Sequence, residues 1–211
     1  MEQRTDDWFA ARLGKVTGSR VADVIAKTKT GYSTSRANYL AQLAIERMTG
    51  QQAESYSNAA MEWGTTQEPF ARNAYETLTG NLVEEVGFVI HPKIDMSGAS
   101  PDGLVGGNGL IEIKCPNSAT HIEYIRSEKA PAKYLPQMAF QMACTGREWC
   151  DFMSYDPRMP DGLQIFLVRY HRDDEYIKEI ESEIVKFLGE VDTTVAELLA
   201  KRNNTILLEA A

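Results

Sequence analysis

The sequence has few cysteines, no long apolar run and no excess of positive charge, and each shortage excludes a class of protein. Its three cysteines are an odd number, and their spacing matches no zinc or iron–sulfur ligand set. No segment approaches the roughly 20 apolar residues that span a bilayer. The first residues contain no apolar signal-peptide core. We therefore expect a cytoplasmic protein with no disulfide framework and no membrane partner.

A net charge of −8 argues against a protein that coats nucleic acid with a basic surface. The charge is unevenly distributed, because residues 1–36 carry a net charge of +3 and residues 172–197 carry −6. Acidic metal sites also contribute negative charge, which bound cations offset. The composition therefore remains compatible with an enzyme that acts on nucleic acid through metal ions.

The length and patterning predict one α/β domain over residues 1–211. Of the 211 residues, 43% are hydrophobic and 25% charged, which is typical of a globular chain, and there is no repeat or long linker. A central mixed sheet of about five strands, flanked by helices on both faces, is expected. Helices are predicted over 6–13, from 17, and over 35–49, 58–79, 118–127, 132–145 and 173–201. Strands are predicted over 82–91, 96–105, 110–115, 148–155 and 162–170, and a loop over 27–35.

Candidate catalytic residues gather in the middle of the chain, at Asp102, Glu112 and Lys114. Residues two apart on a strand point to the same face, so Glu112 and Lys114 project together while Ile113 points into the core. Asp102 precedes Glu112 across the glycine-rich turn at residues 106–109, and a hairpin return brings the two carboxylates together.

Crowded carboxylates repel one another unless a cation lies between them, and their hard oxygens suit Mg²⁺ or Mn²⁺. The carbonyl of Ile113 offers a further oxygen ligand. A lysine beside the metal positions the attacking water and stabilises developing negative charge. An acidic residue two positions before a lysine is also common on solvated strands. Glu112 and Lys114 taken alone could therefore be an ordinary ion pair on the protein surface.

The motif Pro101-Asp102, followed by Glu112-Ile113-Lys114, resembles the PD-(D/E)xK nuclease superfamily. Further stretches resemble, more closely, the phage lambda-type alkaline exonucleases of the YqaJ-like viral recombinase family. They occur in order along the chain: Asp7-Trp8, Arg12-Leu13-Gly14, Thr17-Gly18-Ser19, Trp63-Gly64 with Glu68, Ser100-Pro101-Asp102-Gly103-Leu104, Gly109-Leu110, Glu112-Ile113-Lys114-Cys115-Pro116, Tyr134 with Gln137, and Tyr155-Asp156-Pro157-Arg158-Met159.

The resemblance implies a restriction-endonuclease-like core and a Mg²⁺-dependent 5′→3′ exonuclease. Such an enzyme digests one strand of linear double-stranded DNA from a 5′-phosphorylated end and leaves 3′ overhangs for single-strand-annealing recombination. It also implies a homotrimeric ring around the DNA and a single-strand annealing protein as partner, in a bacterial or phage-infected cell.

The resemblance also assigns roles to individual residues. Glu68, Asp102, Glu112 and the Ile113 carbonyl would hold two Mg²⁺ ions, for which Mn²⁺ can substitute, and Lys114 would lie beside the attacking water. A second set would bind the 5′-phosphate, namely Arg12, Ser19 and Ser100. An arginine gives a planar charged fork for phosphate oxygens, and hydroxyl groups add short hydrogen bonds.

Three further residues would contact DNA: Gln137 near the scissile phosphate, Met61 as an apolar wedge at the DNA end, and Lys29 in a loop toward the duplex groove. Each has a plainer alternative. These are a helix-surface amide for Gln137, core packing for Met61 and a solvated loop lysine for Lys29. Arg12 could equally form a surface ion pair with Asp6 or Asp7, and Trp8 is expected to pack against its own helix.

Two other functions remain open at this point. An endonuclease of the same superfamily, of the restriction or junction-resolving type, would share Asp102, Glu112 and Lys114 without needing a 5′-phosphate pocket. A DNA-end-binding scaffold would bind ends without turnover. A closed circular duplex distinguishes the first, and soluble nucleotide release from a linear duplex distinguishes the second.

Overall fold

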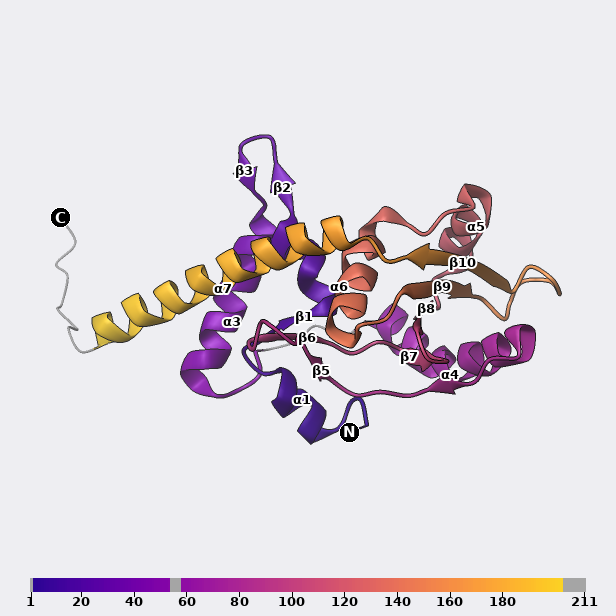
Figure 1. Ribbon diagram of the computed structural model, residues 1–211, viewed down its shortest axis with the longest axis horizontal. Helices are drawn as coiled ribbons and strands as arrows, with labels where there is room; N and C mark the ends of the chain where they lie inside the picture. The colour runs from indigo at the N-terminus through magenta and orange to yellow at the C-terminus, as the bar shows by residue number, and fades with distance from the viewer. Residues whose placement is uncertain (1, 54–57, 203–211) are drawn as a thin grey trace.

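The computed structural model of the chain describes residues 2–53 and 58–202. Residues 1, 54–57 and 203–211 of the domain expected over 1–211 lie outside the described residues. A five-stranded sheet runs through the middle (Figure 1). Its strands lie in the order β10 (Ile165–His171), β9 (Trp149–Tyr155), β8 (Gly109–Lys114), β7 (Gly103–Val105) and β4 (Val83–Glu84). β8 and β9 are parallel and the other neighbours antiparallel, which confirms the predicted mixed sheet.

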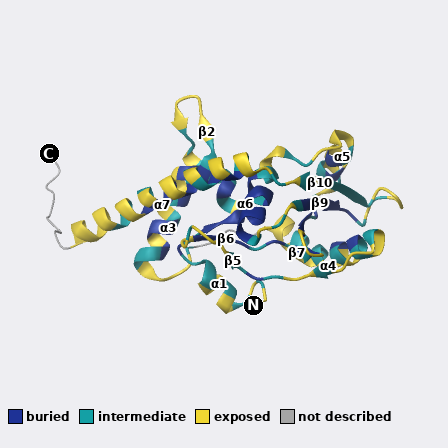
Figure 2. Ribbon diagram, in the orientation of Figure 1, coloured by how far each residue is buried: buried dark blue, intermediate teal, exposed yellow. Residues whose placement is uncertain are grey.

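Helices cover both faces of this sheet, as predicted. On one face α6 (Leu135–Thr145) packs with Leu110 and Phe152, and most of its residues are buried (Figure 2). On the other face α4 (Ala59–Thr79) packs Ala71 and Tyr75 against Ile111 and Ile113. Side chains alternate between the two faces along β8, so Glu112 lies on the α6 side.

A second sheet of three short strands lies beside the first: β1 (Val16–Thr17), β6 (Ser97–Ala99) and β5 (Val89–Ile90). The continuous strands predicted over 82–91 and 96–105 are therefore wrong, because each divides between the two sheets. Gly87 lies between β4 and β5, and Pro101, which has no N–H to donate to a ladder, lies between β6 and β7. The break at Pro101 gives Ser100 and Asp102 separate surroundings.

The remaining helices frame the N-terminal half. Thr5 caps α1 (Asp6–Arg12) by accepting a hydrogen bond from Trp8 N–H. A 3₁₀ turn, η1 (Gly18–Arg20), precedes α2 (Val21–Ile25). Ser33 caps α3 (Thr34–Thr49), which begins one residue before the predicted helix start, because its hydroxyl accepts a hydrogen bond from Arg36 N–H. In the second half, α5 (Ser118–Ser127) and the 3₁₀ turn η2 (Ala132–Tyr134) precede α6.

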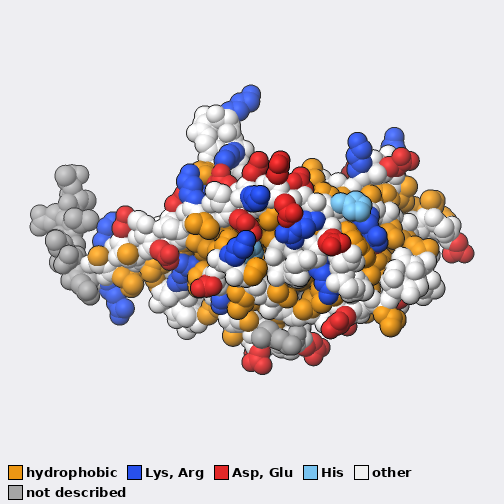
Figure 3. Space-filling view, in the orientation of Figure 1, with side chains coloured by type: hydrophobic (Ala, Val, Ile, Leu, Met, Phe, Trp, Pro, Cys, Tyr) orange, Lys and Arg blue, Asp and Glu red, His pale blue; other side chains and the backbone are white. Residues whose placement is uncertain are grey.

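Two elements extend from the body. The predicted loop at 27–35 instead contains a hairpin, β2 (Lys27–Thr28) and β3 (Gly31–Tyr32), which projects above the molecule (Figure 1). The last helix, α7 (Asp174–Arg202), packs against α2, α3 and α6 and then continues outward. On the face shown in Figure 3, acidic and basic side chains are mixed along α7. None of the helices in the described ranges is long and apolar enough to cross a membrane.

Candidate active site

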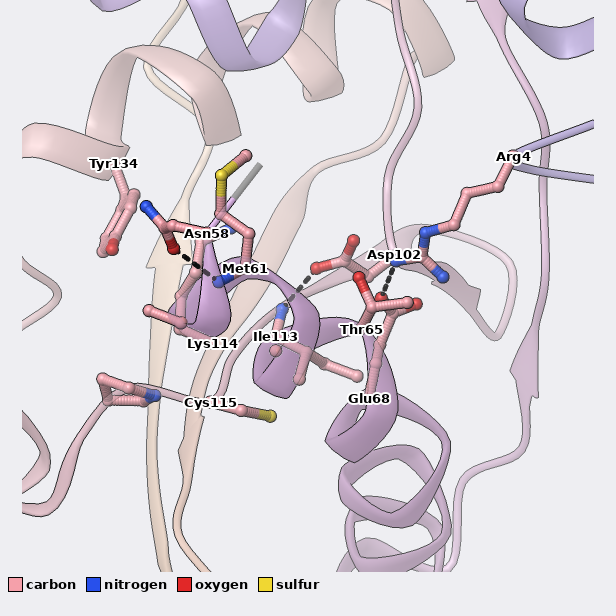
Figure 4. A pocket seen from close by; sticks show the side chains of 13 residues that line it. Arg4, Asn58, Met61, Thr65, Glu68, Asp102, Ile113, Lys114, Cys115 and Tyr134 are labelled. Carbon is pink, nitrogen blue, oxygen red and sulfur yellow. Dashed lines mark hydrogen bonds and ion pairs between the residues drawn. The ribbon is translucent and has the colours of Figure 1, made fainter. Parts of the chain in front are cut away.

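A pocket of about 450 Å³ opens where the first turns of α4 meet the start of β7 and the end of β8. Glu68 reaches it from α4, Asp102 from the turn before β7, and Lys114 from the end of β8 (Figure 4). The structure therefore brings together side chains from three separate parts of the sequence. Arg4, Met61 and Tyr134 complete much of the wall.

Asp102 is fixed by the neighbouring strand. Its Oδ2 accepts a hydrogen bond of 2.6 Å from Ile113 N–H, so the carboxylate lies against the backbone of β8 (Figure 4). Burial and the nearby carboxylates of Glu112 and Glu68 raise the pKa of Asp102 well above its usual value, although Lys114 and the Ile113 N–H oppose that rise. A cation bound beside Asp102 would stabilise the ionised form of its carboxylate.

Glu112 is completely buried and holds a fixed orientation. Its Oε1 and Oε2 accept hydrogen bonds of 2.7 Å from the side-chain amides of Gln137 and Gln141, one turn apart on α6. Lys114 forms an ion pair with Glu112 Oε1. Burial alone would lower the pKa of Lys114, but Glu112 and Asp102 outweigh it and raise that pKa. The two carboxylates therefore favour the ammonium form of Lys114.

Glu68 lies between two arginines. Its Oε2 accepts a 2.6 Å hydrogen bond from Arg4 Nη2, and its Oε1 a 3.1 Å bond from Arg72 Nη2, one turn later on α4. Arg72 also pairs with Glu85 at 2.6 Å. Glu68 is only 15% exposed, which is low for a helix-surface glutamate. The carboxylate of Glu68 is therefore held within the wall of the pocket rather than in solvent.

The donor set of the pocket fits a hard divalent cation. Three carboxylates from Glu68, Asp102 and Glu112, together with the carbonyl of Ile113, are all oxygen donors of the kind Mg²⁺ and Mn²⁺ prefer. Within residues 2–53 and 58–202, no three His, Cys, Asp or Glu side chains already lie in ligand geometry. Existing contacts of the carboxylates account for the absence of ligand geometry. Arg4 and Arg72 bind Glu68. Lys114 and the side-chain amides of Gln137 and Gln141 bind Glu112.

A second pocket, of about 360 Å³, adjoins the first and is lined by Trp8, Arg12, Ser19 and Met61, among others. Ser100 Oγ accepts hydrogen bonds from Trp8 Nε1 at 2.9 Å and from Arg12 Nη1 at 3.3 Å. Arg12 Cζ lies 3.9 Å from the centre of the Trp8 ring. Burial lowers the pKa of Arg12, which nevertheless remains a cation.

The structure decides between several of the sequence interpretations. Met61 is 56% exposed and lines both pockets, so core packing was the wrong alternative. Gln137 holds Glu112 and is not a free surface amide. Arg12 contacts Ser100 and Trp8 and, in the part of the chain that the structure describes, forms no ion pair with Asp6 or Asp7. Lys29 lies in the exposed turn of the projecting hairpin and lines neither pocket.

Sequence reasoning missed four residues that line the two pockets or bind their carboxylates. Arg72 and Gln141 each lie one helical turn from a predicted site residue, Glu68 and Gln137, and that spacing was a usable signal. Trp8 was expected to pack only against its own helix, whereas its indole N–H binds Ser100. Arg4 gave no signal, because it lies outside every motif and reaches Glu68 only through the fold.

Comparisons with known proteins agree on one family. The model of the YqaJ-like viral recombinase domain matches residues 7–148. A crystal structure of an alkaline exonuclease (LHK-Exo) from Laribacter hongkongensis is 53% identical, covers 96% of this chain and 100% of that chain, and has a TM-score of 0.89.

The same Laribacter protein in complex with dAMP is 54% identical over the same shares, with a TM-score of 0.90. A phage related exonuclease from Haemophilus somnus 129PT is only 16% identical, covers 87% of this chain and 96% of that chain, and with a TM-score of 0.72 shows the shared fold alone. No curated protein sequence matches the chain.

Proposed function

The chain belongs to the YqaJ-like viral recombinase family, and from that premise we propose that it is a Mg²⁺-dependent exonuclease acting on DNA ends. It digests one strand of linear double-stranded DNA in the 5′→3′ direction from a 5′-phosphorylated end. The observation that carries the proposal is the convergence of Glu68, Asp102 and Lys114 on one pocket, with Glu112 buried directly behind it. The similar Laribacter protein is described as an alkaline exonuclease.

A bound pair of Mg²⁺ ions would polarise the scissile phosphoryl group, generate the attacking hydroxide and stabilise the leaving oxygen. Glu68, Asp102, Glu112 and the Ile113 carbonyl are the residues that would hold these ions; Mn²⁺ would fit the same donors. Lys114 keeps its proton and directs its ammonium group at the charge that builds on the phosphoryl oxygens. Gln137 and Gln141 hold Glu112 so that its carboxylate does not rotate during the reaction.

The adjoining pocket selects the end of the strand. Ser100 Oγ already accepts two hydrogen bonds, from Trp8 and Arg12, so its own proton is available to donate to an anion. Arg12 supplies a fixed charge backed by the Trp8 ring. Ser19, exposed beside the start of η1, adds a second hydroxyl. We assign these residues to the 5′-phosphate.

The position of Met61 connects the two pockets. It is exposed, lines both cavities and carries a flexible apolar side chain, which suits contact with the last base pair at the point where the strands separate. Lys29, on the projecting hairpin, lies where it can contact a duplex outside the pockets. Gln137 would face the scissile phosphate from its place beside Glu112.

The wider biological role follows the family. The chain acts as a single nuclease domain, assembled as a homotrimer that encloses the duplex, so that the net charge of −8 need not prevent processive digestion. The 3′ overhang that it leaves serves recombination with a single-strand annealing protein. These statements are proposals drawn from the resemblance.

The test compares DNA forms under matched conditions. With Mg²⁺, a linear duplex with 5′-phosphates should release soluble nucleotides, while a covalently closed circle stays intact. With EDTA in place of Mg²⁺, neither should change. Cleavage of the closed circle would support an endonuclease of the same superfamily, and end binding without nucleotide release would support a scaffold. The contact between Arg12 and Ser100, at the second pocket, favours an exonuclease over both an endonuclease and a scaffold.

A further inference from the structure

The proposed chemistry leaves one cation of the catalytic pocket without a role. Arg4 lines the same cavity as Asp102 and Lys114, and its Nη2 lies 2.6 Å from Glu68 Oε2 (Figure 4). In the close-up, Arg4 enters the pocket from the side opposite Lys114 and ends at Glu68. Arg4 thus binds one oxygen of the Glu68 carboxylate, which the proposed function assigns to a metal ion.

The backbone around Arg4 is fixed in place. The side-chain amide of Gln3 donates hydrogen bonds of 2.8 Å to the carbonyls of Val86 and Pro101, which joins the N-terminal segment to the residue before Asp102. Arg4 itself has φ = 68°, a left-handed conformation that is unfavourable for a residue with a side chain. The backbone of Arg4 is therefore held beside the pocket by the fold, while its long side chain can still move.

The two arginines on Glu68 differ in how readily they can leave it. Arg72 is 12% exposed, comes from the same helix and also binds Glu85. Arg4 is 48% exposed, and its side chain binds Glu68. An exposed ion pair contributes little net free energy, because water competes for both charges. Arg72 is therefore the permanent partner of Glu68 and Arg4 the exchangeable one.

We propose that Arg4 is an exchangeable counter-ion of the catalytic pocket, which balances Glu68 before a divalent cation arrives and binds a DNA backbone phosphate afterwards. This inference rests on the proposed function. A divalent cation that binds Glu68 repels the Arg4 guanidinium at the same oxygen. The released guanidinium is a planar charged fork, held at the mouth of the pocket where the substrate strand must pass, and phosphate is its preferred ligand.

The first test measures Mn²⁺ binding by isothermal titration calorimetry without DNA. Arg4→Gly removes the competing guanidinium and suits the left-handed backbone, so it should bind Mn²⁺ about fivefold more tightly than the wild type. Arg4→Lys, which keeps a charge but not the fork, should lie between them. Arg126→Ala, on α5 and outside the pocket lining, is the control and should match the wild type.

The second test measures binding of a short 5′-phosphorylated duplex by fluorescence anisotropy in saturating Mn²⁺, in the cleavage-deficient Lys114→Ala background. Adding Arg4→Gly should weaken binding about fivefold in Mn²⁺ and leave it unchanged in EDTA, where Glu68 still holds Arg4. Equal weakening in both conditions would contradict the exchange.

The outcomes separate this inference from the proposed function. If the wild type binds Mn²⁺ and releases nucleotides from linear DNA, but Arg4→Gly titrates with unchanged or weaker Mn²⁺ affinity, the role of Arg4 is wrong and the nuclease proposal stands. If the wild type binds no Mn²⁺, both are wrong. If Arg4→Gly binds Mn²⁺ more tightly in the first test but leaves DNA binding unchanged in the second, the proposed binding of Arg4 to a backbone phosphate is wrong.

Discussion

Two adjoining pockets of this molecule differ in their charged groups: the acidic pocket is lined by the carboxylates of Glu68 and Asp102, and the cationic pocket by the guanidinium of Arg12. Ser100 binds Trp8 and Arg12, which line the cationic pocket, while Asp102 lines the acidic pocket and binds the backbone N–H of Ile113. Pro101 separates them, and Met61 lines both cavities. A short stretch of the chain therefore contacts both the proposed cation site and the proposed phosphate site.

The two pockets hold their charges by different means. In the acidic pocket the carboxylates of Glu68 and Asp102, together with the buried Glu112 beside them, are balanced by Lys114, Arg4 and Arg72, so the pocket is close to neutral until a ligand displaces one of these partners. In the cationic pocket the charge of Arg12 has no carboxylate partner in the described structure and lies against an aromatic ring. The first arrangement suits exchange of cations, and the second a permanently available phosphate site.

The largest effect on activity is expected from a substitution in the acidic pocket. Lys114→Ala should lower nucleotide release from a linear duplex about a thousandfold, because it removes the only ammonium group described in that pocket, while end binding stays measurable. Lys133→Ala is a matched control, since Lys133 lies 4.8 Å from the Tyr134 ring, as Lys114 lies 5.1 Å from it, but lines neither pocket. Full activity of Lys114→Ala would remove the lysine from the mechanism.

A smaller effect is expected in the cationic pocket. Arg12→Ala should slow digestion of 5′-phosphorylated ends about thirtyfold and leave 5′-hydroxyl ends nearly unchanged, because it deletes a charge-assisted contact to phosphate. Arg20→Ala serves as control, since Arg20 lines the same cavity but is bound to Asp23 and Gln42. Rates measured on the two kinds of end give the ratio. Equal impairment on both ends would contradict a phosphate pocket.

Trp8 allows a finer test of the same pocket. Trp8→Phe keeps an aromatic face for Arg12 but deletes the N–H that binds Ser100 Oγ. Loss of one neutral hydrogen bond should reduce the preference for 5′-phosphorylated ends about fivefold, less than Arg12→Ala does. Digestion of hydroxyl ends should not change. A Trp8→Phe enzyme with the wild-type preference would show that the indole N–H does not orient Ser100.

The smallest effect concerns stability rather than activity, and it separates structural from catalytic carboxylates. Asp156 is buried; burial would raise its pKa, but hydrogen bonds from Arg158 and Ser118 lower that pKa to about 2 from 3.8. A carboxyl whose folded pKa is depressed stabilises the fold above its unfolded pKa and loses that contribution as the pH falls toward the folded value.

Asp156→Asn should therefore lower the free energy of unfolding by about 2 kcal/mol at pH 7, as measured by urea denaturation. The difference from the wild type should shrink progressively below about pH 4. Nucleotide release per folded molecule should stay the same. A difference that does not depend on pH would mean that Asp156 stabilises the fold by packing alone.

Local patterns in the sequence predicted what depends on local structure. The period of a strand placed Glu112 and Lys114 on one face, and the helix predicted over 58–79 matches α4 almost to the residue. The division of residues 82–91 and 96–105 between two sheets was not predictable, because hydrophobic pattern does not reveal which partner a short strand pairs with.

The same limit applied to the candidate site. Gln137 and Gln141 lie one turn apart on a helix, so finding the first could have led to the second. Arg4 and Glu68 are 64 positions apart, and Trp8 and Ser100 are 92 apart. Such contacts arise only when the N-terminal segment packs against the turn before β7. A pattern within one segment cannot indicate them.

Anomalous scattering from crystals soaked in Mn²⁺ tests the central claim most directly, because it locates the ion without reference to activity. The account predicts Mn²⁺ bound by carboxylate oxygens of Glu68, Asp102 and Glu112 and by the carbonyl oxygen of Ile113, with the Arg4 side chain moved off Glu68. Mn²⁺ absent from that pocket at saturating concentration, or bound by other residues, would contradict the account.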